Sequence, residues 1–132
     1  MEKVTQFNIK LKNVPGELAK FSKQVADAWV NILAMSVRSS GDEGMVYLVS
    51  EDPEKTRNTL NVKDIPFSEE PVLMVEIENR VGALAEVTTR FGEESLNIEH
   101  VYTSVSAGGQ NTIAIIKAED VYRALDVFGD EL

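Results

Sequence analysis

The chain has 132 residues, of which 43% are hydrophobic, and its 22 acidic residues against 13 basic ones give a formal net charge of −9. This size and composition predict a folded protein of one ordinary domain or two small ones, and the absence of cysteine excludes disulfides, thiol nucleophiles and thiolate metal sites. The acidity and the scattered basic residues argue against nucleic acid as a partner. No apolar run is long enough to cross a bilayer, and the opening MEKVTQFNIK lacks the apolar stretch of a signal peptide, so we expect a cytoplasmic protein with no membrane partner.

The chain contains an internal repeat. The segment NVPGELA at residues 13–19 returns as NRVGALA at residues 79–85, and Asn31-Ile32 returns as Asn97-Ile98 at the same offset of 66. Six of the 20 ungapped positions from 13 to 32 are identical to their counterparts, where average residue usage gives roughly one. The sequence therefore predicts a duplication, with one unit over residues 1–70 and a second over residues 71–132.

The first repeat opens with alternating apolar and polar residues, which predict a half-buried strand that ends at Asn13. Apolar residues at helical spacing then predict a helix that stops before Asn31. Pro15 suits the first turn of that helix, where its missing N–H costs nothing. The β-branched and apolar segments at 31–37 and 45–49 predict two further strands, joined by the polar, glycine-bearing link SSGDEG.

A second helix and a fourth strand complete the first repeat. Asp52, with a proline and a glutamate after it, marks the start of the helix. Val62, Ile65 and Phe67 predict the strand despite Pro66, because proline is tolerated at a sheet edge. The predicted order of the first unit is therefore βαββαβ.

The second repeat follows the same order and then stops short. It predicts a strand through Leu73, Val75 and Ile77, a helix after Asn79, two strands joined by SAGGQN, and a closing helix. At the offset of 66, most of its fourth strand falls beyond Leu132. Either the second sheet has a bare edge or another segment covers that edge.

The motif Asn-x-x-Gly-x-Leu-Ala after the first strand, with Asn-Ile before the second, resembles ACT domains, the small amino-acid-sensing modules attached to metabolic enzymes. Both repeats resemble this family, and together they span nearly the whole chain. The plan is similar to that of stand-alone tandem ACT proteins. The first loop is close to the family form D/N-R-P-G-x-L, whereas the second keeps the arginine and loses the proline. The resemblance implies an α+β fold of two ferredoxin-like βαββαβ units in tandem, the second lacking most of its last strand.

The repeated loop has features of an amino-acid site. Glycine lets a ligand approach the backbone, the first helical turn offers unpaired N–H groups to a carboxylate, and asparagine oxygens accept from an ammonium group. The resemblance implies binding at an interface between two ACT units, through Asn79 and Asn97 or their counterparts. The candidate ligand-binding residues are Asn79, Arg80, Val81, Gly82, Ala83, Leu84, Asn97, Ile98 and His100 in the second repeat, and Asn13, Val14, Pro15, Gly16, Glu17, Leu18, Asn31 and Ile32 in the first. We favour Asn79 and Asn97, because that repeat matches the pattern more fully and carries His100.

Structural interpretations compete with the ligand site. Asn13 and Asn79 are equally well explained as helix caps, and Asn31 and Asn97 as residues that tolerate a left-handed helix exit. His100 is more simply a satisfied histidine in a sheet. Arg80 either pairs with a carboxylate or, like most exposed loop arginines, does not. Trp29 is most simply core or interface packing.

No carboxylate pair or histidine pair has a spacing that suggests catalysis or metal binding, so we expect neither an enzyme nor a cofactor. The leading hypothesis is a non-catalytic, allosteric regulatory module, a homodimer that senses a small amino acid or related metabolite. The alternative is a protein-interaction scaffold with a degenerate ligand site, which assembles through sheet edges.

Overall fold

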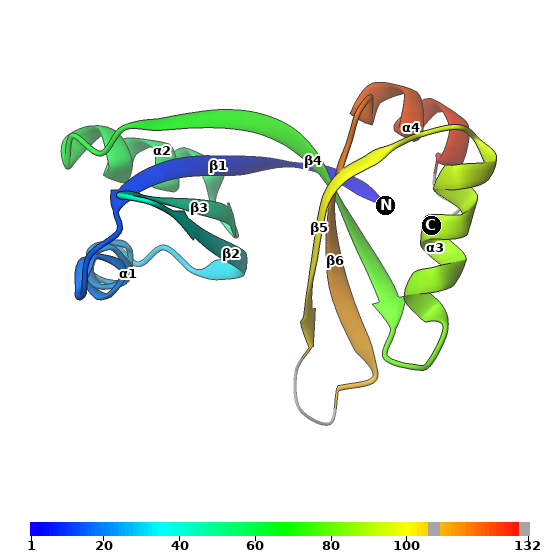
Figure 1. The fold of residues 1–132 in the computed structure, drawn as a ribbon, viewed down its shortest axis with the longest axis horizontal. Helices are drawn as coiled ribbons and strands as arrows, with labels where there is room; N and C mark the ends of the chain where they lie inside the picture. The colour runs from blue at the N-terminus through cyan, green and yellow to red at the C-terminus, as the bar shows by residue number, and fades with distance from the viewer. Residues whose placement is uncertain (106–108, 130–132) are drawn as a thin grey trace. The chain divides into compact units, whose positions relative to one another are not determined.

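The computed structural model describes residues 1–105 and 109–129, so part of the predicted SAGGQN link and the last three residues lie outside the described residues. The chain divides into two compact units. We call Thr5–Glu70 the first unit, and Met1–Val4 with Pro71–Leu132 the second. Figure 1 shows both, and each is described by itself below.

The first unit has the predicted βαββαβ order. Its sheet has the strand order β2-β3-β1-β4, and β3 pairs antiparallel with both β1 and β2. Phe7 of β1 lies opposite Leu48 of β3, which places both side chains on the buried face. The elements are β1 (Glu2–Lys12), α1 (Glu17–Asp27), β2 (Ile32–Ser40), β3 (Glu43–Ser50), α2 (Pro53–Val62) and β4 (Phe67–Glu78).

The second unit continues from β4 with the order βαββα. Its elements are α3 (Ala83–Glu93), β5 (Ile98–Val105), β6 (Asn111–Ala118) and α4 (Val121–Phe128), and β6 pairs antiparallel with β4 and β5. The edge next to β4 is covered, because β1 is the neighbour of β4 and its first residues belong to this unit. Of the two arrangements that the sequence left open, the covered edge is the one observed.

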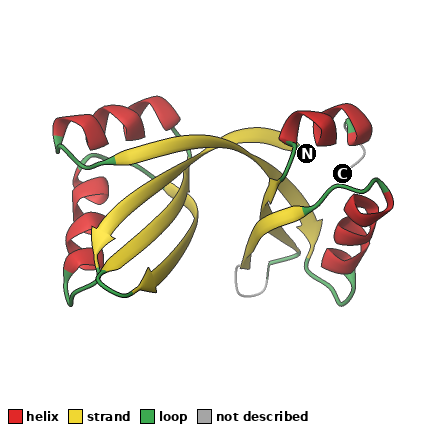
Figure 2. Cartoon of the chain, turned by 45° about the horizontal axis from the view of Figure 1, so that its top comes forward, coloured by secondary structure: helices red, strands yellow, loops and turns green. Residues whose placement is uncertain are grey.

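Each unit packs two helices on one face of its sheet (Figure 2), and the two cores match position by position. Two of these matched positions exchange sizes: Phe21 and Val25 in the first unit correspond to Val87 and Phe91 in the second. Because a large and a small side chain change places on adjacent helical turns, the core volume is kept. The other matched core pairs at the offset of 66 are Phe7 with Leu73, Ile9 with Val75, and Val30 with Leu96.

The predicted fourth strand of the first repeat is partly wrong. Val62 is the last residue of α2 and is 79% exposed, and Ile65 lies in the link after it. The strand begins only at Phe67 and runs without a break to Glu78, so the end of one repeat and the start of the next form one strand. The helix extends farther than predicted because it ends in a left-handed residue at Asp64, with Ile65 anchored by a bond from its N–H to the carbonyl of Leu60.

Two further expectations about α1 are also corrected. Pro15 lies in the turn before the helix, since Gly16 is the N-cap and Glu17 the first helical residue. Trp29 is 85% exposed and has a left-handed backbone with φ of 60°, which corrects the expectation of a core position and leaves interface packing as a prediction.

The left-handed helix exits lie two residues before the predicted asparagines. Trp29 rather than Asn31, and Ser95 rather than Asn97, has a positive φ. The next residue in each unit is buried, and its N–H donates to a carbonyl five positions back, from Val30 to Val25 and from Leu96 to Phe91. This is the Schellman arrangement, in which the buried residue after the turn fixes where the helix ends.

Candidate functional site

The asparagine of each loop fastens the loop to a hairpin and does not cap the helix. In the first unit, the backbone N–H of Asn13 donates to Asp42 O at 2.9 Å and its Nδ2 donates to Gly41 O at 2.8 Å. Asn79 does the same in the second unit, with bonds to Gln110 O at 2.8 Å and Gly109 O at 3.1 Å. The capping interpretation of these two asparagines is therefore wrong. Among the described residues no donor reaches either Oδ1, so this oxygen is the atom that each asparagine can offer to a ligand ammonium.

Glycine in each loop is required by its backbone angles. Gly16 has φ of 89° and Gly82 has φ of 90°, and both are the N-caps of the helices that follow. No atom lies within 4 Å of where a Cβ would stand on either glycine, so the constraint is conformational and not steric. No side chain caps α1 or α3. No acceptor in the described ranges bonds to the first-turn N–H groups of Leu18 and Ala19, or to those of Leu84 and Ala85. These N–H groups therefore remain open to a ligand.

Arg80 is held by two glutamates that the sequence interpretation overlooked. Its Nε lies 2.7 Å from Glu78 Oε2, and its Nη2 lies 2.7 Å from Glu86 Oε2. Hydrogen bonds to Glu86 and then Glu78 raise the pKa of Arg80 above its usual value, and the bond from Arg80 lowers the pKa of Glu86. A ligand carboxylate would have to compete with both glutamates. The sequence did contain a signal for these two glutamates. They flank the second loop at the positions where the first repeat has Lys12 and Lys20.

The second asparagine of each unit lies at the start of its strand. Asn31 precedes β2, where its carbonyl accepts from the N–H of Glu51 at 2.9 Å and its Nδ2 donates to the Glu51 carboxylate at 2.9 Å. Asn97 precedes β5, where its carbonyl accepts from Glu119 N at 2.9 Å and its N–H donates to Glu119 Oε1 at 3.0 Å. Each is thus joined to the residue that follows the neighbouring strand.

The two asparagines of one unit lie at opposite ends of a strand. Asn13 is bonded to the link after β2, whereas Asn31 stands before β2. The nine residues of β2 span roughly 30 Å at about 3.3 Å per residue. A single amino acid cannot reach both, so the structure does not bring the two predicted asparagines of a unit together. The same separation holds for Asn79 and Asn97 across β5.

The other predicted site residues divide into exposed and packed groups. Val14, Leu18, Val81 and Leu84 are exposed, and Val81 is exposed completely. Ile32 and Ile98 pack against the cores, and Ala83 is buried. Glu17, the first residue of α1, is half-buried.

His100 lies within β5, far from the Asn79 loop. It stands opposite Lys117, and its ring centroid is 5.0 Å from that of Tyr102. The side chain is half-buried, and its ring is tilted by 43° to that of Tyr102 in the same strand. This placement matches the interpretation as a packed histidine in a sheet.

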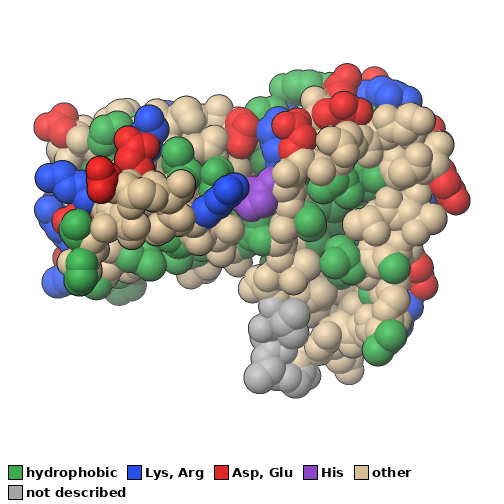
Figure 3. All heavy atoms as spheres, in the orientation of Figure 1, with side chains coloured by type: hydrophobic (Ala, Val, Ile, Leu, Met, Phe, Trp, Pro, Cys, Tyr) green, Lys and Arg blue, Asp and Glu red, His purple; other side chains and the backbone are tan. Residues whose placement is uncertain are grey.

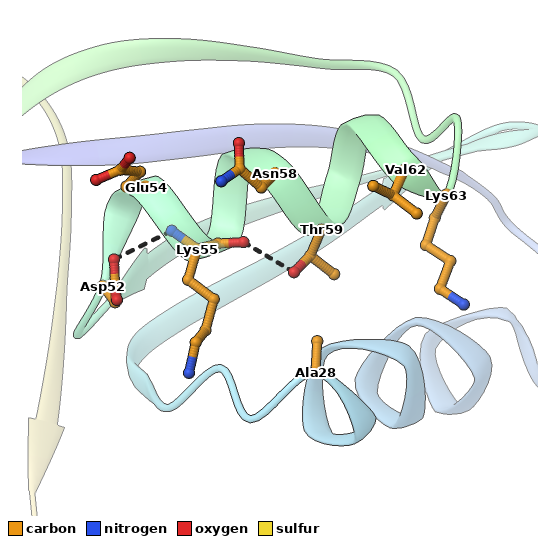
Figure 4. Close-up of a pocket in the computed structure, with 8 residues that line it drawn as sticks. All are labelled: Ala28, Asp52, Glu54, Lys55, Asn58, Thr59, Val62 and Lys63. Carbon is orange, nitrogen blue, oxygen red and sulfur yellow. Dashed lines mark hydrogen bonds between the residues drawn. The ribbon is translucent and has the colours of Figure 1, made fainter.

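A separate hollow lies in the first unit between α2 and the end of α1 (Figure 4). Its volume is about 490 Å³ and it contains none of the predicted site residues. Lys55 crosses it, and its Nζ donates to Trp29 O at 3.2 Å. Asp52 accepts from Lys55 N at 3.1 Å, and Thr59 Oγ1 donates to Lys55 O at 2.8 Å. These hydrogen bonds cap the start of α2 and join it to the end of α1, so they have a structural explanation.

The described residues offer little else for chemistry. Within residues 1–105 and 109–129, no group of three or more histidine, aspartate or glutamate side chains could hold a metal ion. No helix in these ranges combines the length and apolar composition that a membrane span requires. Acidic and basic side chains are interspersed on the face shown in Figure 3.

The two units together define a pair of ferredoxin-like modules, each with a glycine-bent loop fastened to a hairpin by asparagine. The chain belongs to the ACT domain pair family, whose profile matches residues 2–130. This confirms the family that the loop motifs indicated. No curated protein shows significant similarity to the chain.

Solved structures show the same fold at low sequence identity. Protein BT0572 from Bacteroides thetaiotaomicron has a TM-score of 0.88 at 22% identity, with 98% of this chain and 88% of that chain covered. The ligand-free regulatory subunit of aspartate kinase from Thermus thermophilus has a TM-score of 0.61 at 16% identity, with 96% and 90% covered. E. coli aspartokinase III in complex with lysine and aspartate has a TM-score of 0.55 at 14% identity, and the match covers all of this chain but 32% of that one.

Proposed function

We propose that the chain is a non-catalytic regulatory module that binds a small amino acid or a related metabolite at its Asn-x-x-Gly loops. The observation that carries the proposal is the preserved loop geometry. Both loops keep the asparagine bond to the hairpin, the left-handed glycine and the uncapped helix start, although the residues around them differ. Two copies of one backbone arrangement with open N–H groups favour a common ligand chemistry.

An amino acid has complementary groups for this loop. Its carboxylate can accept from the first-turn N–H groups of Leu18 and Ala19, or of Leu84 and Ala85. Its ammonium group can donate to Oδ1 of Asn13 or Asn79. The ligand's remaining surface would face the exposed apolar residues of the loop, and this contact would favour a small side chain.

We further propose that the chain works as a homodimer. Asn13 and Asn31 stand at opposite ends of β2, so a ligand that contacts an asparagine of each kind needs a loop from one ACT unit and a strand start from another, and a second copy of the chain can supply that other unit. The regulatory subunit of aspartate kinase from Thermus thermophilus, a separate chain of similar extent, supports a regulatory role for this fold. Aspartokinase III, whose structure holds lysine and aspartate, supports amino acids as the ligand class.

The alternative function, a scaffold that assembles through sheet edges, rested on a bare edge next to β4. That edge is occupied by β1. The edge that motivated the scaffold is therefore not bare, and the loop geometry supports the ligand-binding proposal instead.

The proposal predicts that one or more amino acids stabilise the chain. A ligand at about 100 times its dissociation constant adds about 2.7 kcal/mol to the free energy of unfolding. Thermal unfolding with each standard amino acid at millimolar concentration should therefore show a rise in Tm for a small subset of them. An equal Tm with every amino acid would contradict the proposal, and isothermal titration calorimetry of the best ligand gives its stoichiometry.

A further inference from the structure

The two loops carry opposite charges at matching positions. Lys12 and Lys20 flank the first loop, whereas Glu78 and Glu86 occupy the corresponding positions of the second. Arg80 of the second loop corresponds to the uncharged Val14 of the first. The two repeats thus share a backbone but carry reversed charges at two positions around the loop and a charge in only one repeat at a third.

The two loops have the same backbone hydrogen bonds and nearly the same glycine dihedral angles. The glycines differ by 1° in φ and by 3° in ψ, from 89° and −14° to 90° and −11°. Side chains at matching positions therefore leave the backbone in the same direction. The matched bonds are Val14 N to Lys12 O and Arg80 N to Glu78 O, both 3.0 Å, and Glu17 N to Val14 O and Ala83 N to Arg80 O, both 3.3 Å.

The second loop shows where such side chains reach. Glu78 and Glu86 meet one guanidinium at 2.7 Å each, so groups at these two positions can enclose a single ion beside the helix start. In the first loop the two positions carry ammonium groups instead. Val14 between them is 52% exposed and supplies no counter-charge, and no ion pair to Lys12 or Lys20 is found in the described part of the chain.

We infer that the loop of the first unit selects an amino acid with an acidic side chain, and that the loop of the second unit disfavours one. This inference rests on the proposed function, which supplies the site. Lys12 and Lys20 are the residues that recognise the second carboxylate of the ligand.

The second loop lacks this attraction. Its Arg80 already bonds to Glu78 and Glu86, so the three side chains together carry a net negative charge. A ligand with an extra carboxylate would displace one glutamate from Arg80 and meet the repulsion of both. The two loops of one chain therefore differ in the ligand charge that they accept.

The test compares glutamate with glutamine, which have nearly the same shape and differ in side-chain charge. Calorimetric titration of the full chain should show glutamate binding about fivefold more tightly than glutamine, as expected for two exposed ion pairs. The preference should fall at high salt, because these charges are exposed. In Lys12→Glu/Lys20→Glu the preference should disappear, whereas in the control Lys3→Glu/Lys63→Glu, with the same change of net charge away from both loops, it should remain.

A charge transplant gives the complementary test. Glu78→Lys/Arg80→Val/Glu86→Lys gives the second loop the charges of the first, and the number of glutamate sites per chain should double. Equal affinity for glutamine, or a preference that survives Lys12→Glu/Lys20→Glu, overturns this inference and leaves the proposed function in place. If no standard amino acid binds at millimolar concentration, the proposed function itself is overturned.

Discussion

At the scale of single residues, the duplicated asparagines and glycines show which structural roles can be predicted from a sequence. The glycines were predictable, since a loop that enters a helix with a positive φ favours glycine in any context. The bond from Asn13 to the hairpin was not, because its partner at Gly41 is distant in sequence and the same side chain is also a common cap. The bonds of Arg80 to Glu78 and Glu86 depend in the same way on side-chain directions that spacing alone does not give.

Trp29 gives a prediction about stability at this scale. It is the single tryptophan of the chain, it has φ of 60°, and its exposure of 85% means that little contact would be lost on its removal. A left-handed backbone costs a residue with a Cβ more than it costs glycine, so Trp29→Gly should stabilise the chain by about 1 kcal/mol. Chemical denaturation followed by circular dichroism measures the change.

Ser95 is the matched control in the second unit. It stands at the same helix exit with φ of 55°, so Ser95→Gly should stabilise to a similar extent. A loss of stability in Trp29→Gly, together with a gain in Ser95→Gly, would show that the indole makes contacts in solution that the exposed side chain does not indicate.

At the scale of elements, the sequence predicted local patterns well and junctions poorly. Alternation and helical spacing located β1, β3 and the helices, because each pattern reports one buried face. The exit of α2 was misplaced because a left-handed turn at Asp64 depends on the burial of the residue after it. The cover of the open edge by β1 was left undecided because it joins the start of the chain to a strand some 70 positions away.

The contact between α2 and β4 gives a pH-dependent prediction. Arg57 Nε donates to Glu69 Oε2 at 2.8 Å and Arg57 Nη2 donates to Glu69 Oε1 at 2.6 Å. The hydrogen bond from Arg57 lowers the pKa of Glu69 below its usual value. A carboxyl whose pKa is lower in the folded chain than in the unfolded one stabilises the fold above its unfolded pKa, and that stabilisation is lost as the pH falls through the folded pKa.

Glu69→Gln should therefore lower the Tm at neutral pH, and its difference from the original chain should shrink once the pH falls below the usual glutamate pKa of about 4.3. Thermal melts of both proteins over a range of pH measure this. Lys23 and Asp27, an exposed pair on one helix, provide the comparison through Asp27→Asn, whose effect should be smaller. A constant difference between the Glu69→Gln variant and the original chain down to low pH would contradict the role given to the ion pair.

At the scale of the whole molecule, the two repeats share a scaffold, while the charged side chains around their Asn-x-x-Gly loops have diverged. The matched cores keep the folds alike, and the loops keep their backbone, so the differences are confined to side chains around the helix starts. Under the proposed function, such an arrangement would let one chain respond to two ligands or to one ligand at two sites. The sequence indicated the family and the loops, and the structure added that the two asparagines of a unit lie at opposite ends of a strand.

Amide chemical shifts recorded during titration test the central claim, amino-acid binding at these loops, most directly. With an amino acid that raises the Tm, the amides of Leu18 and Ala19, or of Leu84 and Ala85, should shift in proportion to occupancy, together with the Nδ2 protons of Asn13 or Asn79. Saturating shifts at these groups are the result that we predict. Shifts confined to other parts of the chain, such as the hollow beside Lys55, would contradict the assignment of these loops as the ligand site.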